Sequence, residues 1–163
     1  MANIVVWNTN GDIDYSSEPY NFYIGRSKSM TSPLANPFTH NGKRSSLAKL
    51  SFKTREEALE AYELYFDKMY GADESFTNEF NRIYKAYKTG HDVFLQCFCK
   101  PLPCHGDIIA RKLQEKLIRE KREEFKRNKE ENITNYKEST ENKEEKEEII
   151  EKKKEKNGLD WIF

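Results

Sequence analysis

Three cysteines and a histidine lie within nine residues of this sequence, as Cys97, Cys99, Cys104 and His105. Thiolate and imidazole groups bind zinc in tetrahedral sites. A thiolate beside an imidazole is also a nucleophile with a proton carrier at hand. Asp107 adds a carboxylate two residues later. We therefore interpret residues 97–107 as the chemical centre of the protein.

In the metal interpretation, Cys97, Cys99, Cys104 and His105 bind one zinc ion, the only cofactor that the sequence suggests. Side chains two residues apart on a strand point to the same face, so Cys97 and Cys99 can act together. Two prolines then turn the chain and bring Cys104 and His105 back toward them. The spacing differs from paired Cys-x-x-Cys knuckles, and adjacent ligands are unusual.

In the reactive interpretation, Cys104, His105 and Asp107 are the catalytic residues at the start of a predicted helix. The free N–H groups and the dipole of a helix N-terminus favour a thiolate or a bound anion. His105 or Asp107 would carry protons. A third interpretation stays open, in which the thiols are small buried apolar groups and Asp107 only caps the helix.

Three short apolar runs predict buried strands that position this segment, at residues 4–7, 21–24 and 92–97. Their apolar residues do not alternate with polar ones, which is typical of a parallel sheet covered on both faces. Two amphipathic helices are predicted between the second and third strands, over residues 55–70 and 74–88. Thr54 and Glu57 form a capping-box pattern at the first of them. A third helix is predicted from about Gly106.

This order of elements predicts an α/β fold: a small, mostly parallel sheet flanked by helices, with a charged C-terminal extension that is helical or disordered. Residues 1–118 hold all the cysteines and nearly all the aromatic residues, enough for one core. Residues 119–156 contain 13 Lys or Arg and 13 Glu, which indicates a solvated tether. Residues 157–163 form an apolar docking peptide.

A long polar loop over residues 26–51 follows the second predicted strand, and loops of this length are often functional. Gly25 lets the backbone approach a ligand, and Arg26 can bind a phosphate or carboxylate with two parallel hydrogen bonds. The carboxyl ends of parallel strands meet at one edge of a sheet, so Arg26 should face the cysteine segment. We expect a nucleotide or sugar-phosphate site there, with ligand-binding residues Gly25, Arg26, Ser27 and Asn36, and with His40 near it.

The net charge is zero, which argues against a general attraction to nucleic acid or membranes; direct nucleic-acid binding through a local basic patch is left open. No apolar stretch is long enough to cross a bilayer, and the N-terminus lacks a secretory signal pattern. Clustered cysteines without such a signal indicate a reducing compartment. We expect a cytoplasmic protein without membrane contact.

The last six residues break abruptly from the charged run and end in large apolar side chains. They resemble the short peptides by which bacterial and phage replication proteins bind the sliding clamp, although Gly158 stands in place of the usual glutamine. The resemblance implies that the tail binds a sliding clamp or another replication protein. Docking of the peptide on its own domain is the alternative. The partner-binding residues would be Leu159, Trp161, Ile162 and Phe163.

Four segments in the same order resemble a family found in phages and bacteria, domain of unknown function 4326: residues 22–26, 36–38, 55–58 and 97–107. The likeness spans about residues 4–117. Residues 26–36 form a longer loop than the family's short connection, and the charged tail lies outside the family. The resemblance implies a phage or bacterial origin, hence the host cytoplasm for a phage protein, but no particular reaction. It also implies one shared site containing Gly25, Arg26, Asn36, Cys99, Cys104, His105 and Asp107.

Two functions fit these observations. The first is a nucleotide- or sugar-phosphate-related ligand or enzyme site, tethered to replication machinery by the C-terminus. The second is a non-enzymatic host- or replication-interaction protein whose cysteines hold a structural zinc ion.

Overall fold

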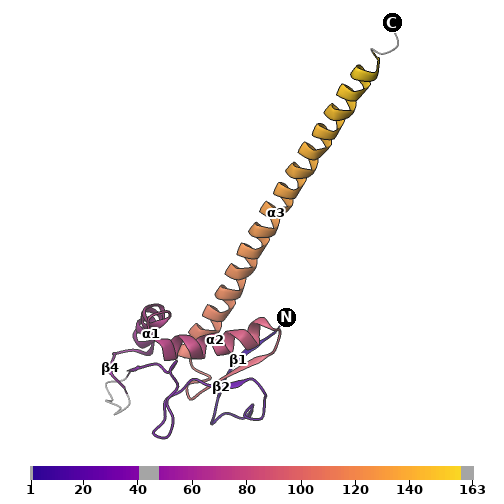
Figure 1. Cartoon of the computed structure of the whole chain (residues 1–163). Helices are drawn as coiled ribbons and strands as arrows, with labels where there is room; N and C mark the ends of the chain where they lie inside the picture. Colours follow the sequence, from indigo (N-terminus) through magenta and orange to yellow (C-terminus); the bar gives the residue numbers. More distant parts are fainter. Residues whose placement is uncertain (1, 41–47, 159–163) are drawn as a thin grey trace. The chain divides into compact units, whose positions relative to one another are not determined.

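The computed structural model of the protein describes residues 2–40 and 48–158 (Figure 1). The chain forms two compact units, residues 1–117 and residues 118–163. The first unit contains every strand among the described residues, two complete helices and the start of a third. The candidate site residues of the 97–107 segment all belong to this first unit.

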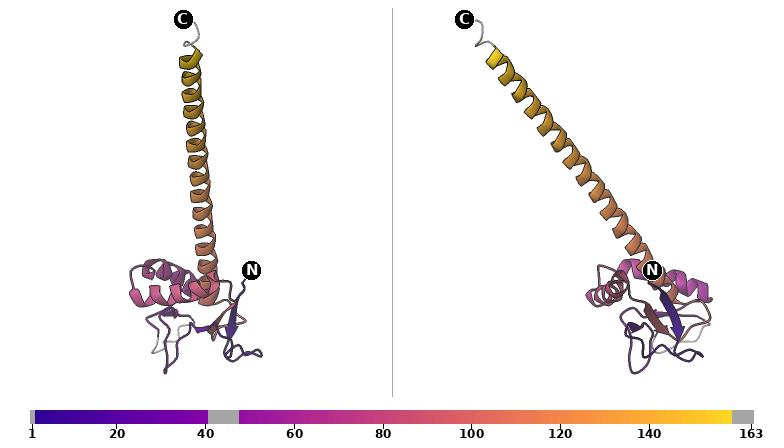
Figure 2. Two further views of the ribbon diagram at one scale, coloured as in Figure 1. Left: turned by 45° about the vertical axis from the view of Figure 1, so that its right-hand side comes forward. Right: turned by 90° about the vertical axis from the view of Figure 1, so that its right-hand side faces the viewer.

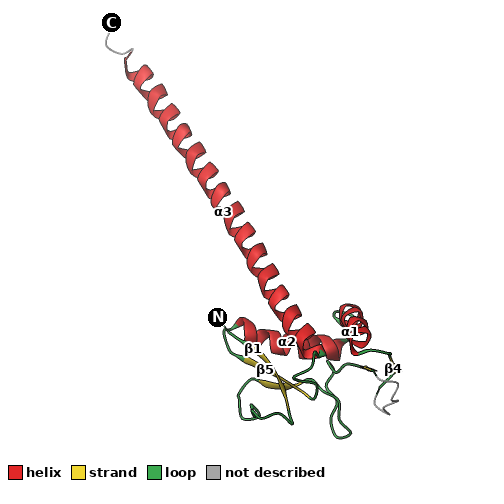
Figure 3. Ribbon diagram, turned by 180° about the vertical axis from the view of Figure 1, so that it is seen from behind, coloured by secondary structure: helices red, strands yellow, loops and turns green. Residues whose placement is uncertain are grey.

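A three-stranded parallel sheet is the centre of the first unit (Figure 3). Its strands are β1 (Ile4–Asn8), β2 (Asn21–Tyr23) and β5 (Val93–Cys97), in the order β1-β5-β2. Strand β5 pairs in parallel with both neighbours. The predicted fold class, a small α/β domain with a parallel sheet flanked by helices, is confirmed. The central place of β5 puts Cys97 at the carboxyl edge of the sheet.

A second pair of strands lies within the segment that the sequence predicts as loop. Strands β3 (Phe38–Thr39) and β4 (Leu50–Ser51) are two residues each and pair in parallel. Pairs this short need no apolar run, so hydrophobic periodicity does not reveal them. They fix the position of residues 36–40 beside the first helix.

Helices α1 (Arg55–Met69) and α2 (Glu74–Lys88) confirm the two amphipathic predictions. The capping box of α1 is complete: the Thr54 hydroxyl accepts the backbone N–H of Glu57 at 3.1 Å, and the Glu57 carboxylate accepts that of Thr54 at 3.3 Å. These bonds satisfy N–H groups that a helix start leaves open. Arg55 is thereby fixed as the first residue of α1.

The two faces of the sheet are covered differently. Helices α1 and α2 lie on one side of the sheet (Figure 2). Val93, Leu95 and Cys97 are fully buried in one core cluster with residues of these two helices. On the other face, Tyr15 from the β1–β2 loop stacks on Phe94 at 4.8 Å. Cover on both faces is therefore provided by helices on one side and by a loop on the other.

Helix α3 (His105–Gly158) begins in the first unit and runs through the charged region. Its first turns bury Ile109 and Leu113 in the core. Within the described residues, no helix combines the length and apolar character that a membrane span requires. The predicted partner-binding residues Leu159, Trp161, Ile162 and Phe163 lie outside the described part of the chain.

Candidate functional site

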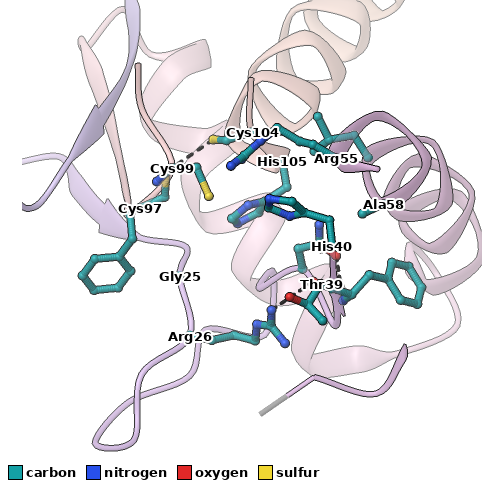
Figure 4. A pocket seen from close by; sticks show the side chains of 14 residues that line it. Gly25, Arg26, Thr39, His40, Arg55, Ala58, Cys97, Cys99, Cys104 and His105 are labelled. Atoms are coloured by element: carbon teal, nitrogen blue, oxygen red, sulfur yellow. Dashed lines mark hydrogen bonds between the residues drawn. The ribbon is translucent and has the colours of Figure 1, made fainter. Parts of the chain in front are cut away.

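A cavity of about 250 Å³ lies where the chain leaves β2 and β5 and meets the first turns of α1 and α3 (Figure 4). Parallel strands deliver their carboxyl ends to this edge, as expected for a ligand site in an α/β fold. Among the residues predicted for this site, Ser27 and Asp107 do not line the cavity. The others do, namely Gly25, Arg26, Asn36, His40, Cys97, Cys99, Cys104 and His105.

Three free thiols form one wall of this cavity. Cys97 ends β5 and Cys104 directly precedes α3, and their Sγ atoms lie 3.3 Å apart. Both side chains are buried, with exposed fractions of 0% and 1%. Cys99 is half-buried, and its backbone N–H donates to the Cys97 sulfur at 3.4 Å. Cys99 is thus the member of the cluster that a ligand can reach most directly.

The pKa values of the three thiols move in different directions. Hydrogen bonds with Cys104, Cys97 and His105 together lower the pKa of Cys99 far below its ordinary value. Hydrogen bonds with Cys97 and Cys99, together with burial, raise the pKa of Cys104. The bond with Cys104 lowers the pKa of Cys97, but the contact with Cys99 and burial outweigh it, and the net direction is upward. Cys99 is therefore the thiol that ionises first.

His105 is held in one orientation at the base of this wall. Its Nε2 lies 2.8 Å from the carbonyl oxygen of Ile24. A carbonyl oxygen only accepts, so Nε2 carries a proton and Nδ1 is the basic nitrogen of the neutral ring. Tyr62 packs edge-on against the ring at 5.2 Å, and its buried hydroxyl donates to the Leu34 carbonyl at 2.6 Å. Because Nε2 is engaged, the hydrogen bond that lowers the pKa of Cys99 is assigned to Nδ1.

Two arginines from separate segments face the same cavity. Arg26 follows β2, and its Nη2 donates to the Phe38 carbonyl at 2.9 Å. Burial lowers the pKa of Arg26 and the nearby Cys99 raises it, and an arginine remains a cation throughout the ordinary pH range. Arg55 donates from Nη1 to the Pro103 carbonyl at 3.2 Å. Of the described residues that line the cavity, none is Asp or Glu, so the cavity favours an anion.

Asp107 serves the helix start. One carboxylate oxygen accepts the backbone N–H of Cys104 at 2.9 Å, and the other accepts the Lys100 ammonium at 2.5 Å. In return, the Cys104 sulfur accepts the backbone N–H of Gly106 at 3.2 Å. This arrangement is similar to a capping box, but the Cys104 sulfur replaces the usual hydroxyl and accepts the N–H of the second helical residue rather than the third. These contacts explain Asp107 as a structural residue at the start of α3. Its catalytic role stays a prediction.

We expect Asp107→Ala to lower the free energy of unfolding by about 0.5–1 kcal/mol, since a helix cap is lost and its partly exposed ion pair adds little. Asp107→Asn keeps an acceptor for the Cys104 N–H but cannot take up or release a proton, so it is the matched control. Chemical denaturation measures stability, and iodoacetamide measures Cys99 reactivity. If Asp107→Asn is as stable as the parent but loses Cys99 reactivity, Asp107 is a proton carrier and capping alone does not describe its role.

The predicted zinc ligands do not form a preformed tetrahedral set. Within residues 2–40 and 48–158, no group of three or more His, Cys, Asp or Glu side chains is arranged to hold a metal ion. The 3.3 Å between the Cys97 and Cys104 sulfurs is shorter than the roughly 3.8 Å that two sulfurs on one tetrahedral zinc ion would keep. The bond from His105 Nε2 to the Ile24 carbonyl leaves only Nδ1 of this ring as a possible zinc ligand. Zinc binding stays a prediction that metal analysis tests.

A family model with the description "Domain of unknown function (DUF4326)" matches residues 8–115 of the chain. The chain belongs to this family. The match includes every residue that lines the cavity and both helices that complete the core, which confirms the resemblance seen in the sequence. Searches of curated proteins and of solved structures give no match.

Some residues of the DUF4326 site escape sequence reasoning. Arg55 opens one of the four segments that resemble the family, but the local pattern predicts only a helix start there. Tyr62 has the spacing of a core residue, and its support of His105 depends on tertiary packing. The Ile24 carbonyl that orients His105 is backbone and leaves no mark in the sequence.

Proposed function

We propose that the DUF4326 domain binds a phosphate-bearing nucleotide or sugar in this cavity and acts on it through Cys99 and His105. The proposal is supported above all by one observation. Arg26 and Arg55 face the same cavity as the half-buried thiol of Cys99, and the described lining contains no carboxylate.

The anion end of the ligand is assigned to the arginines and the two helix starts. The first turn of α1 lines the cavity through Arg55, Ala58 and Leu59, and α3 lines it through His105. Each helix N-terminus carries about half a positive charge from aligned peptide dipoles. Two such ends and two guanidinium groups favour a doubly charged phosphate over a single carboxylate.

The remainder of the ligand is assigned to the apolar part of the lining. Phe38, Leu59 and Phe98 offer apolar surface, and Phe98 is 45% exposed. Asn36 and Thr39 add polar groups that can hydrogen-bond sugar hydroxyls. A cavity of about 250 Å³ is smaller than the usual ~300–1,000 Å³ of small-molecule pockets. It suits a sugar phosphate or a mononucleotide better than a dinucleotide.

The proposed chemistry is a nucleophilic displacement at Cys99. The sulfur forms a bond to an electrophilic centre of the ligand while the leaving group departs with its electron pair. The proton of the thiol is held by Nδ1 of His105, and the Ile24 carbonyl keeps that ring in place. Cys104, the cysteine that the sequence favours for this role, is instead buried and serves as the cap of α3.

Replacing Arg26 with Ala should weaken binding of a phosphate ligand about 10- to 100-fold, because one charge-assisted hydrogen-bonding group is lost. The parent protein is first screened by thermal shift, under reducing conditions, against inorganic phosphate, ribose 5-phosphate, nucleoside mono- and diphosphates and ADP-ribose. Calorimetry then compares the variants with the best ligand. Arg122→Ala is the matched control, since it removes the same charge from an exposed position of α3.

Equal binding by the parent and Arg26→Ala would remove Arg26 from the site. The absence of any shift across the whole panel would contradict the phosphate proposal itself. The absence of any shift would favour the non-enzymatic alternative, for which the convergence of three thiols is the supporting observation. One zinc ion per chain by elemental analysis, with thiols that resist labelling, is the signature of that alternative.

The C-terminal peptide is a separate part of the proposal. We expect the full chain to bind a bacterial or phage sliding clamp, because the large apolar side chains of the peptide would fill the clamp groove. The Leu159→Ala, Trp161→Ala, Phe163→Ala triple variant lacks these side chains and should lose binding. Glu155→Ala, in the charged run, is the control. Biolayer interferometry on immobilised clamp measures both. No binding by the parent, or equal binding by the triple variant, rejects the tether.

A further inference from the structure

The three cysteines share one wall of the cavity, and the sulfurs of Cys97 and Cys104 lie 3.3 Å apart. We propose that Cys97 and Cys104 form a reversible disulfide bond and that Cys99 is the thiol through which a small hydroperoxide oxidises them. This redox activity is additional to the proposed ligand chemistry. It depends on the positions of three sulfur atoms and not on which ligand the cavity binds.

The geometry favours the Cys97–Cys104 pair. Their sulfurs must shorten their separation from 3.3 Å to about 2.05 Å to bond. The two residues belong to different elements, the end of β5 and the residue before α3. Residues 98–104 join these elements without helix or strand, so the connection can absorb a movement of little more than 1 Å.

Access to an oxidant favours Cys99 as the first thiol to react. Cys97 and Cys104 are 0% and 1% exposed, whereas Cys99 is half-buried and lines the cavity beside Arg26. Cys99 is also a neighbour of the other two thiols: its backbone N–H donates to the Cys97 sulfur at 3.4 Å, and all three residues line the same cavity (Figure 4). An accessible thiol beside two protected ones is the arrangement in which an oxidised sulfur is resolved within the same chain.

The steps balance as follows. The Cys99 sulfur attacks the terminal oxygen of the hydroperoxide, the O–O bond breaks, and the released alkoxide takes up a proton to leave as an alcohol. The resulting Cys99 sulfenic acid is attacked by the Cys104 sulfur, and its hydroxyl leaves with the Cys104 proton as water. Cys97 then attacks the Cys104 sulfur of the mixed disulfide and returns the Cys99 thiol. In sum, one hydroperoxide and two thiols give one disulfide, one alcohol and one water.

Formation of this disulfide would change the shape of the cavity wall at the proposed ligand site. This consequence rests on the proposed function. The Cys104 sulfur accepts the Gly106 N–H at the start of α3, and the Cys97 sulfur accepts the Cys99 N–H. Drawing the two sulfurs together pulls the start of α3 toward the end of β5, and His105 and Cys99 move with them. Oxidation is therefore expected to switch ligand binding, while the disulfide itself forms whether or not a ligand exists.

The test uses the full chain, reduced, freed of reductant and treated with a small excess of hydrogen peroxide. Thiol titration should fall from three to one per chain and return to three with dithiothreitol. After alkylation, chymotrypsin cleaves behind Phe98 and separates Cys97 from the other two cysteines. A Cys97–Cys104 disulfide then links two peptides, whereas a Cys99–Cys104 disulfide stays inside one peptide.

Cys99→Ser should slow disulfide formation roughly tenfold or more while leaving the Cys97–Cys104 pair able to form. In the Cys97→Ser variant, oxidation should stop at the Cys99–Cys104 disulfide. Three titratable thiols after peroxide treatment, or disulfides only between chains, would overturn the proposal. Both outcomes are measured on the parent protein, so they do not depend on how a variant folds. Ligand binding measured in dithiothreitol decides the proposed function separately, so that the two can fail independently.

Discussion

Cys99 is expected to be alkylated by iodoacetamide at neutral pH well before Cys97 or Cys104. Its pKa is lowered by hydrogen bonds with Cys104, Cys97 and His105, so the reactive thiolate persists at pH values where an ordinary thiol is protonated. The alkylation rate should therefore be nearly constant from pH 6 to pH 8 and fall only in acid. An ordinary thiol, with a pKa of about 8.5, would instead gain roughly tenfold in rate for each pH unit over that range.

Two variants separate the sources of this reactivity. Cys99→Ser should abolish the fast phase, leaving the slow labelling of two buried thiols. His105→Gln keeps an N–H for the Ile24 carbonyl but offers no basic nitrogen, and it should slow labelling at pH 7 by roughly tenfold, with an inflection at higher pH. Mass spectrometry of the chymotryptic peptides identifies the labelled residue. Fast labelling of Cys104, or a rate that rises steadily through pH 8, would contradict the assignment of Cys99.

The sheet and the first two helices are readable from the sequence because local patterns and tertiary packing agree there. Val93, Leu95 and Cys97 face the helices, while Phe94 faces the loop that carries Tyr15. Both faces of β5 are thus covered, which explains the apolar run from Val93 to Leu95. The capping box at Thr54 is a local signal that needs no tertiary contact.

The choice among the three thiols is not readable from the sequence. Spacing places Cys104 at a helix start, where a thiolate is stabilised, and that argument led to Cys104 as the nucleophile. The structure adds that Cys104 is buried against Cys97 and uses its sulfur for the Gly106 N–H. Exposure and proximity to His105 distinguish Cys99, and both properties arise from how the 98–104 loop folds back.

Gly106 is expected to be indispensable for placing the start of α3 against the sheet. A Cβ atom built on Gly106 would lie 2.6 Å from Cγ1 of Val6 and 2.9 Å from Cδ1 of Ile24. Gly106→Ala should therefore lower the free energy of unfolding by about 1–3 kcal/mol, the usual range for overpacking a core. It should also slow Cys99 alkylation, because relief of the clash displaces the adjacent His105. Urea denaturation and the alkylation assay measure the two effects.

A double-mutant cycle tests the steric cause, because helix propensity alone predicts the opposite sign. Alanine favours a helix interior over glycine by about 1 kcal/mol, so Gly106→Ala would stabilise the protein if the contact with Val6 and Ile24 were absent. Val6→Ala shortens the side chain that the new methyl group meets first. The Val6→Ala, Gly106→Ala double variant should be more stable than the sum of the single changes predicts, by about 0.5–3 kcal/mol. Additive effects, or a Gly106→Ala protein as stable as the parent, would show that α3 can start without close contact to the sheet. The wall that holds Cys99 and His105 would then depend on the Asp107 cap and on the contacts of His105 with Ile24 and Tyr62.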